Sequence, residues 1–389
     1  MPNKSIKIAY CIPSLYSVSG MEKTLTIKAN YFSEVYNYKI YVILTDGKGL
    51  LPAFPLSEKI EVVNLNINYD TIWSFPIYKK ATYYIYKQWI YRKRLTKVLN
   101  DIKPDITISM LRREINFITK IKDGSIKIGE LHFNKSNYRD FNTNRNNNIP
   151  QIIKVFIAKL WMDQLIKNIK RLDKFIVLSY EDMAKWNELN NLSVIYNPIE
   201  KFPKVVSDNT SKKVIAAGRF VDQKGFDMLI DCWKIVSIKH PDWTLSIYGN
   251  GNKDEFQTQI ENNNISDSCL LFDSVQNLDE KFAESSIFAF SSRFEGFGMV
   301  ITEAMASGLP PVAFACPCGP KDIIHDGVDG LLVEQGNIES LADKICLLIE
   351  NEEIRKEMGR MARIRAERFR IENISKEWDT LFHSLIDKN

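Results

Sequence analysis

The stretch S-R-F-E-G-F-G-M-V-I-T-E-A-M-A-S, residues 292–307, decides the fold and the kind of site that this chain carries. It follows a short apolar run, residues 287–291, which the pattern predicts to be a buried strand. Gly296 and Gly298 permit a tight loop, and from Met299 onward the apolar residues recur at helical spacing. A glycine loop that joins a strand to a helix directs backbone N–H groups and the positive end of the helix dipole to one point. Such a point binds anions, above all phosphates.

Two carboxylates flank this predicted anion site. Glu295 precedes the helix, and Glu303 lies eight residues later, in the second turn. One carboxylate can therefore reach past a bound phosphate while the other lies beside it, which suits a ligand with hydroxyl groups at both ends, a nucleotide ribose and a sugar. A solvated glutamate at a helix start, next to an accidental Gly-x-Gly sequence, is the alternative interpretation of the same residues.

Length and composition favour a globular protein of two domains. The chain has 389 residues, of which 45% are hydrophobic and 26% charged, and it is too long for one ordinary hydrophobic core. The N-terminal apolar run is too short for a signal peptide, and no window approaches 18 uninterrupted apolar residues. We therefore expect a cytoplasmic protein without a membrane span, in which the six scattered cysteines are reduced and structural.

The charge is divided unevenly along the chain. Residues 1–200 contain 30 Lys and Arg against 18 Asp and Glu, a balance of +12, whereas residues 201–389 contain 22 against 30, a balance of −8. The basic half predicts an anionic partner for that half. The sequence contains no nucleic-acid recognition module, so we do not expect that partner to be a nucleic acid.

Residues 70–100 combine basic with aromatic side chains, and Asp70 is their single acid. The basic residues are Lys79, Lys80, Lys87, Arg92, Lys93, Arg94 and Lys97, and the aromatic ones are Trp73, Phe75, Tyr78, Tyr83, Tyr84, Tyr86, Trp89 and Tyr91. A basic helix that carries Tyr and Trp suits the headgroup layer of an anionic membrane. We therefore expect peripheral contact with the inner face of the cytoplasmic membrane. The alternative is a core helix whose lysines are merely solvated.

Short apolar segments alternate with helical segments in both halves of the chain. In the first half we expect strands at 6–12, 39–45, 60–65, 105–110, 126–131 and 174–179, and helices at 21–35, 81–100, 112–122 and 150–170. In the second half we expect strands at 214–217, 243–248, 270–272, 287–291 and 310–314, and a helix at 226–239, after a polar linker at 202–213. This alternation predicts two doubly wound α/β domains with parallel sheets, whose ligands bind at the carboxyl ends of the strands.

Further candidate site residues follow these predicted strands. His132 comes directly after a strand of the first half, and Gly20 lies where a strand-end loop enters a helix. Arg219 and Lys224 follow the first strand of the second half, five residues apart, so both can face the glycine loop and bind a diphosphate. The alternatives are surface solvation for each basic residue and a backbone hydrogen bond for the histidine.

Two motifs are missing from the chain. It contains no Asp-x-Asp sequence, which commonly holds a divalent ion against a nucleotide diphosphate, and no G-x-x-x-x-G-K-[ST] loop. The second absence disfavours an ATPase or a kinase. We expect neither a metal nor a cofactor, and the phosphate charge would be met by Arg219, Lys224 and helix N-termini.

Two motifs together resemble those of the retaining glycosyltransferases of family four. They are G-R-x4-K-G at residues 218–225 and E-G-F-G-x4-E-A-M-A at residues 295–306. The resemblance is strongest over residues 214–370, which include C-G-P-K-D-I-I-H-D-G-V-D-G-L-L-V at 318–333 and are similar to enzymes of capsule, exopolysaccharide and lipopolysaccharide synthesis. The first half matches only in outline, by a strand, a glycine near residue 20 and a histidine at a strand end.

The resemblance implies a GT-B fold, in which two Rossmann-like domains face each other across a cleft and a final helix crosses back to the first domain. The acceptor domain is then expected at 1–200 together with 371–389, and the donor domain at 201–370. It also implies a retaining hexosyltransferase that uses a nucleotide diphosphate sugar, UDP rather than GDP or ADP. The expected acceptor is a growing, lipid-linked bacterial surface glycan.

The resemblance further implies roles for single residues. Arg219 and Lys224 would hold the donor diphosphate, and Glu303 would bind the ribose hydroxyls. Glu295 and His132 would lie beside the donor sugar, so these two join the basic pair as the expected catalytic residues. The other implied donor contacts are Gly20, Val275, Gly298, Met299 and Val300. One departure is that Ser19 precedes Gly20, where many relatives have paired glycines.

The sequence identifies no carboxylate nucleophile for a double displacement. The resemblance implies front-face attack instead, in which the departing phosphate helps to take the proton of the acceptor, while the protein positions the substrates and stabilises the leaving diphosphate. Two alternatives stay open. One is a sugar-phosphate synthase or phosphorylase of the same fold, for whose acceptor phosphate Arg112 and Arg113 could form a site. The other is a non-catalytic glycan-assembly protein.

Overall fold

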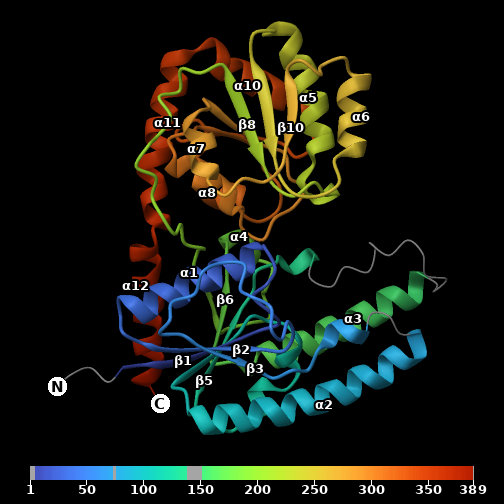
Figure 1. Cartoon of the computed structure of the whole chain (residues 1–389), viewed down its shortest axis with the longest axis vertical. Helices are drawn as coiled ribbons and strands as arrows, with labels where there is room; N and C mark the ends of the chain where they lie inside the picture. Colours follow the sequence, from blue (N-terminus) through green and yellow to red (C-terminus); the bar gives the residue numbers. More distant parts are fainter. Residues whose placement is uncertain (1–4, 73–75, 138–150, 389) are drawn as a thin grey trace. The chain divides into compact units, whose positions relative to one another are not determined.

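The computed structural model describes residues 5–72, 76–137 and 151–388, which form two compact units (Figure 1). Unit 1 consists of the described residues within Met1–Leu178, Asp182–Pro198 and Ile371–Asn389. Unit 2 comprises Ser179–Glu181 and Ile199–Arg370. Each unit is an α/β domain built on a parallel sheet, and the predicted fold class of two Rossmann-like domains is thereby confirmed.

Unit 1 contains a sheet of seven strands in the order β3-β2-β1-β4-β5-β6-β7, and all of its pairs are parallel. The strands are β1 (Lys7–Ile12), β2 (Lys39–Leu44), β3 (Glu61–Asn64), β4 (Ile106–Ser109), β5 (Ile126–Glu130), β6 (Lys174–Val177) and β7 (Leu192–Val194). The central strands are rich in buried β-branched residues, which explains why their pattern was recognisable. The sequence did not indicate β7, because this edge strand has three residues and is only half-buried.

Helices cover both faces of this sheet. The helices α1 (Gly20–Glu34) and α12 (Ile371–Ile386) pack on the core that contains Ile8, Phe32 and Trp378. The helices α2 (Ile77–Ile102) and α3 (Gln151–Ile169) pack on the opposite core, through side chains such as Leu95, Leu99 and Leu165. The final helix of the chain is therefore part of unit 1, as the GT-B expectation requires.

Short elements join the strands of unit 1. They are η1 (Tyr69–Ile72), η2 (Arg113–Asn116), η3 (Ile118–Lys120), η4 (Lys135–Asn137) and, at the boundary of the units, α4 (Tyr180–Met183). The helix predicted at 112–122 is wrong, because this segment forms only the two 3-10 turns η2 and η3. Phe117 lies between them with φ −144°, outside the helical region, and the segment is rich in β-branched residues, which favour helices weakly.

Unit 2 contains a sheet of six parallel strands in the order β10-β9-β8-β11-β12-β13. The strands are β8 (Lys213–Ala217), β9 (Thr244–Tyr248), β10 (Cys269–Phe272), β11 (Ile287–Phe290), β12 (Pro311–Phe314) and β13 (Leu331–Val333). The first six strands of unit 1, taken along the chain, have the same order. Each sheet therefore reverses its strand order beside its first strand.

The helices of unit 2 connect its strands. They are α5 (Phe226–Lys239), α6 (Asp254–Asn262), α7 (Leu278–Ala283), α8 (Met299–Ala306), α9 (Pro320–Ile323), α10 (Ile338–Glu350) and α11 (Glu352–Ala366), with the 3-10 turns η5 (Asp222–Lys224) and η6 (Glu367–Phe369). The helix α5 has the predicted bounds, and it packs on α10, while α8 packs on α11. No helix within the described ranges is long and apolar enough to cross a membrane. The six cysteines are buried, free thiols.

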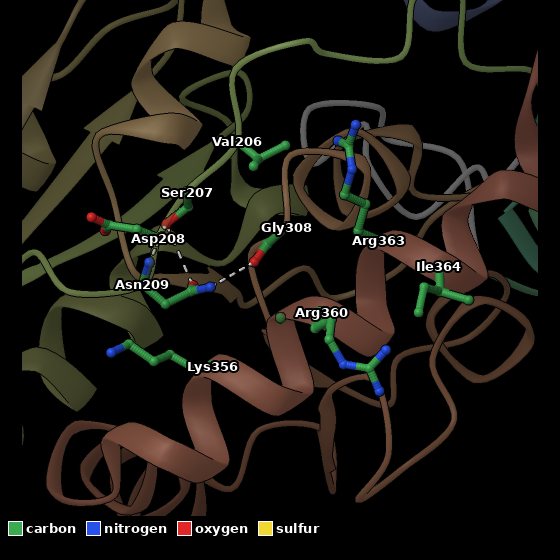
Figure 2. A pocket seen from close by; sticks show the side chains of 10 residues that line it. Val206, Ser207, Asp208, Asn209, Gly308, Lys356, Arg360, Arg363 and Ile364 are labelled. Carbon is green, nitrogen blue, oxygen red and sulfur yellow. Dashed lines mark hydrogen bonds between the residues drawn. The ribbon is translucent and has the colours of Figure 1, made fainter.

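The polar segment predicted as a linker is fastened to unit 2. The Ser207 amide donates to the Ser307 carbonyl oxygen over 2.9 Å, and the Asn209 side chain donates to the Gly308 carbonyl oxygen over 3.0 Å. Figure 2 shows the open hollow that this segment forms with α11. Three basic side chains line the hollow, but each has a protein partner: Lys356 pairs with Glu352, Arg360 with Glu357, and Arg363 donates to backbone oxygens. The hollow is thus a packing seam.

Candidate functional site

The candidate site of unit 2 lies where its sheet changes direction, between β8 and β11. Parallel sheets of this kind bind ligands outside the carboxyl ends of the strands at that point. The loop after β8 carries Arg219 and Lys224, and the loop after β11 carries Glu295 and Gly298. The structure therefore places these four predicted residues of unit 2 on two adjacent loops, although they are up to 79 positions apart in the sequence.

Lys224 and Glu295 form an ion pair. The Nζ atom of Lys224 lies 2.6 Å from Oε1 of Glu295, and the side chains are only 15% and 9% exposed. The Ser292 hydroxyl donates to the same carboxylate oxygen over 2.8 Å. Ser292 was not singled out from the sequence, and its position three residues before Glu295 in a tight loop is the signal that could have indicated it. An incoming anion therefore has to compete with Glu295 for the lysine.

Gly225 makes this pairing possible. It has φ +62°, a conformation that side chains disfavour, and a Cβ atom there would lie 2.2 Å from the Ser291 carbonyl oxygen. The Ser291 hydroxyl in turn donates to the Lys224 carbonyl oxygen over 3.0 Å. The close approach of the two loops at this glycine holds Lys224 against the end of β11.

Replacing Gly225 by Ala should therefore destabilise unit 2 and weaken anion binding. Gly327 is the matched control, because it has φ +76° but a Cβ atom there would meet no other atom within 4 Å. The control Gly327→Ala should cost only the backbone strain of about 1–2 kcal/mol, a fall in melting temperature of roughly 2–8 °C. Gly225→Ala should lower the melting temperature further and reduce UDP binding in calorimetry. Equal effects of the two variants would contradict the close-approach argument.

The start of α8 forms the second part of the site. Gly298 is its N-cap residue, with φ +98°, and no side chain caps the helix. Met299 and Val300 lie in the first turn, where backbone N–H groups and the helix dipole favour an anion. Glu303 follows one turn later and is half-buried. The first two turns of α8 thus carry backbone amides and a carboxylate after the loop that carries Glu295.

The remaining predicted residues of unit 2 are more exposed. Arg219 follows β8 with an exposed side chain, which forms no ion pair with any residue that the structure describes. Val275 is 39% exposed and lies in the loop after β10, the edge strand of the sheet, rather than beside β11. Its contact with a base stays a prediction, and Arg219 has a side chain that can turn toward a bound diphosphate.

A salt bridge to α5 holds the loop after β11 in place. Arg293 forms a two-pronged salt bridge with Asp227 of α5, with N–O distances of 2.8 and 2.6 Å. Burial alone would raise the pKa of the Asp227 carboxyl. The hydrogen bonds that Arg293 donates and its positive charge outweigh this effect, so the pKa is lowered. The Arg293 amide also donates to the Gln223 carbonyl oxygen over 2.8 Å. These contacts fix the loop that carries Glu295 to the turn that carries Lys224.

In unit 1, Gly20 lies after the loop that follows β1, and His132 lies just after β5. Gly20 is the first residue of α1 and is exposed, while the hydroxyl of the preceding Ser19 donates to the Glu22 carboxylate. The His132 side chain is 4% exposed, and its Nε2 atom lies 3.1 Å from Oε1 of Glu130. Glu130, the last residue of β5, was not among the residues predicted for the site.

The two arginines considered for a second phosphate site already have protein contacts. The Arg112 guanidinium lies 4.8 Å from the centre of the Phe133 ring. The Arg113 guanidinium lies 4.0 Å from the centre of the Tyr69 ring and 3.5 Å from the Asp46 carboxylate. A phosphate at Arg113 would have to compete with this carboxylate, so the geometry gives the synthase alternative no specific support.

Most described aromatic residues of α2 are on its surface. Ile85 and Trp89 are 69% and 61% exposed, and Tyr83, Tyr84 and Tyr86 are also exposed, whereas Tyr91 belongs to the core. The basic residues Lys79, Arg92, Lys93, Arg94 and Lys97 are exposed as well. Trp73, Phe75 and the Tyr78 side chain lie outside the described residues. The described part of α2 therefore presents basic and aromatic side chains together to solvent.

A metal site is not found in the part of the chain that the structure describes. No three His, Cys, Asp or Glu side chains there are grouped so that they could hold a metal ion. The independence from metals stays a prediction, which rests on the missing Asp-x-Asp sequence and on the basic pair.

Several known proteins are similar to this chain. Residues 198–365 match the family model described as glycosyl transferases group 1. An uncharacterized glycosyltransferase of Haemophilus influenzae is 27% identical over 377 residues, which are 96% of this chain and 98% of that protein. A poly(ribitol-phosphate) alpha-N-acetylglucosaminyltransferase of Staphylococcus aureus is 31% identical over 225 residues, which are 57% of this chain and 46% of that enzyme.

Solved structures share the fold. The crystal structure of HepE from Anabaena in complex with UDP superposes with a TM-score of 0.74, at 17% sequence identity, over 97% of this chain and 100% of that one. The fold is therefore GT-B, and the match of unit 2 supports a glycosyltransferase of the group 1 type. Other similar proteins are an amylovoran biosynthesis glycosyltransferase of Erwinia amylovora, 29% identical over 54% of this chain, and a poly(glycerol-phosphate) alpha-glucosyltransferase of Bacillus subtilis, 26% identical over 48% of it.

Proposed function

We propose that this chain is a retaining hexosyltransferase of family four. It transfers the sugar of a nucleotide diphosphate sugar, with UDP as the nucleotide, to a growing, lipid-linked bacterial surface glycan, without a metal ion. The observation that carries the proposal is the Lys224–Glu295 pair beside the start of α8, at the point where the sheet changes direction. The UDP complex of a protein with the same fold supports the choice of nucleotide.

Each residue of unit 2 has a proposed role. Lys224 and Arg219 bind the diphosphate and stabilise the charge that develops on it as the glycosidic bond breaks. The amides of Gly298, Met299 and Val300 contact the phosphate and the sugar, and Glu303 binds the ribose hydroxyls. When the diphosphate binds Lys224, the ion pair between Lys224 and Glu295 breaks, and Glu295 then lies beside the sugar ring.

The proposed residues of unit 1 are fewer. Gly20 approaches the phosphate through its backbone, which a side chain would hinder. His132 acts on the donor sugar, and the departing phosphate helps to take the proton of the acceptor, so that no protein nucleophile is required. Catalysis then consists of positioning and of charge stabilisation.

The choice of donor is tested by binding. Among UDP-, GDP- and ADP-sugars, the UDP-sugars should raise the melting temperature most, because a ligand that binds only the folded state stabilises it by mass action. The shift should be unchanged in EDTA, since the diphosphate charge is met by Arg219, Lys224 and backbone amides. Loss of the shift in EDTA would contradict the metal-free proposal, and the absence of a shift with every nucleotide sugar would contradict the donor proposal itself.

We also propose that α2 docks unit 1 on the anionic inner face of the cytoplasmic membrane, where a lipid-linked acceptor is presented. The exposed aromatic and basic side chains of α2 support this proposal. Each Lys or Arg near an anionic surface contributes on the order of 1 kcal/mol, so a few of them suffice for reversible attachment.

Vesicle co-sedimentation tests the membrane proposal. At low salt, more protein should sediment with phosphatidylglycerol-containing vesicles than with neutral ones, and salt should release it because exposed charges are screened. The variant Lys93→Glu/Lys97→Glu should reduce this binding. The matched control Lys204→Glu/Lys234→Glu changes two exposed lysines of unit 2 and should leave it unchanged. Equal recovery with both kinds of vesicle would contradict membrane docking.

A further inference from the structure

Three titratable side chains form a buried chain of contacts in unit 1. Lys28 comes from α1, Glu130 is the last residue of β5, and His132 follows two residues later. The Lys28 ammonium donates to Oε1 of Glu130, and Nε2 of His132 lies 3.1 Å from the same oxygen. The exposed fractions of the three side chains are 1%, 1% and 4%. One carboxylate oxygen thus lies between an ammonium group and an imidazole.

An aromatic ring and a buried hydroxyl group are also near this chain of contacts. Lys28 lies 4.4 Å from the centre of the Trp378 ring, which α12 contributes. The buried hydroxyl of Tyr10, on β1, and the second carboxylate oxygen of Glu130 have no hydrogen-bond partner among the described residues. Burial raises the pKa of Tyr10, and the negative charge of Glu130 raises it further. The second oxygen of Glu130 therefore lacks the hydrogen bonds that water would give it.

The cationic neighbours of Glu130 lower the pKa of its carboxyl. Burial would raise the pKa of this carboxyl, but the charges of Lys28 and His132 and the hydrogen bond from Lys28 outweigh burial and lower it to about 2. Burial lowers the pKa of Lys28, against the opposing effect of Glu130. Lys28 therefore favours the charged form of Glu130, whereas burial without such a cation would favour the protonated form.

Stability alone does not explain such a pair. Taking two charges out of water costs several kcal/mol for each ion, and apolar side chains of similar volume commonly stabilise a core as well or better. A buried carboxylate next to an imidazole has a chemical use, because it fixes the orientation of the ring and stabilises its protonated form. The Nε2 contact is close but poorly aligned for a hydrogen bond, so the interaction here is chiefly electrostatic.

We propose that Glu130, paired with Lys28, is a positioning residue that orients and polarises the His132 ring for sugar transfer. This inference rests on the proposed function, in which His132 acts on the donor sugar. Neither Glu130 nor Lys28 touches the substrate in this proposal. Their effect passes through the imidazole.

The test compares the release of UDP from UDP-glucose and UDP-N-acetylglucosamine by the full chain and its variants. Glu130→Gln should lower kcat on the order of 10- to 100-fold and leave KM and UDP binding within about twofold, as expected for the orienting partner of a histidine. In a His132→Asn background, the same substitution should lower kcat less than about twofold, because an effect that passes through His132 disappears with it.

A second variant separates positioning from folding. Glu130→Gln alone leaves the Lys28 charge without its partner, whereas Lys28→Met/Glu130→Gln removes both charges and should recover the melting temperature but not kcat. Lys127→Met/Asp123→Asn is the matched control: it removes the buried ion pair of 2.5 Å that involves the same strand β5 but does not contact His132. This control should leave kcat unchanged.

Two outcomes would overturn the inference alone. The first is a recovery of kcat in Lys28→Met/Glu130→Gln, which would mean that the pair is purely structural. The second is that Glu130→Gln lowers kcat by the same factor in the wild-type and His132→Asn backgrounds. If the wild-type chain binds no nucleotide sugar in calorimetry, the proposed function fails, and this inference fails with it.

Discussion

Replacing Glu295 by Gln is expected to separate turnover from binding: kcat should fall about 100-fold or more, while UDP binds about fivefold more tightly. The fall in kcat is expected because Glu295 is proposed to act beside the sugar ring, where charge develops during transfer. The tighter binding follows from the ion pair of 2.6 Å with Lys224. In the free wild-type chain the carboxylate holds the lysine, and Gln would release this lysine to the diphosphate.

Calorimetry with UDP and steady-state kinetics with a UDP-sugar measure the two effects. Glu303→Gln is the matched control on α8, because it removes a carboxylate that is proposed to bind an unreactive part of the donor. It should weaken UDP binding about tenfold and leave kcat nearly unchanged, since its contact is the same in the ground and transition states. If Glu295→Gln weakens UDP binding and Glu303→Gln mainly lowers kcat, the two carboxylates have been assigned the wrong way round.

Lys224→Met is expected to weaken UDP binding by roughly 1.5–3 kcal/mol, the scale of hydrogen bonds to charged groups, which corresponds to about 10- to 150-fold. It should also lower the melting temperature, because Glu295 is only 9% exposed and loses its cation. Arg219→Met is the matched comparison. Its side chain is exposed and forms no ion pair with any described residue, so binding should weaken without a change in melting temperature.

The double variant Lys224→Met/Glu295→Gln completes this comparison. With both charges absent, the melting temperature should return toward the wild-type value, while UDP binding stays weak. A melting temperature that does not recover would mean that the lysine stabilises unit 2 by contacts other than this ion pair.

The sequence predicted most of the fold because the sheets are parallel and buried. Central strands such as β1 and β11 are continuous apolar runs, and helices such as α5 have a regular apolar spacing with clear ends. Short elements at the edges were missed, among them β7 and β13, because three residues show no periodicity. The segment 112–122 was misjudged for a related reason: buried isoleucines at helical spacing also fit successive 3-10 turns.

The sequence indicated which residues to consider for the candidate site, but not which of them contact one another. Motif spacing singled out Lys224 and Glu295 independently, yet nothing in the sequence showed that they pair with each other. Glu130 and Lys28 were missed because they are 102 positions apart and each lies in a segment whose pattern indicates only packing. Contacts between distant segments depend on the order of strands in the sheet, which a single sequence does not determine.

The way in which the chain enters and leaves unit 2 has a consequence for how such proteins diversify. Ile199 and Arg370 form a parallel bridge, and the Ile199 amide donates to the Phe369 carbonyl oxygen over 2.7 Å. The main part of unit 2, residues 199–370, is therefore an insert whose two ends meet at one hydrogen-bonded point. Such an insert can be exchanged by recombination as a cassette, because its two junctions lie side by side at Ile199 and Arg370. Under the proposed function, such an exchange would change the donor sugar and leave the acceptor domain unchanged.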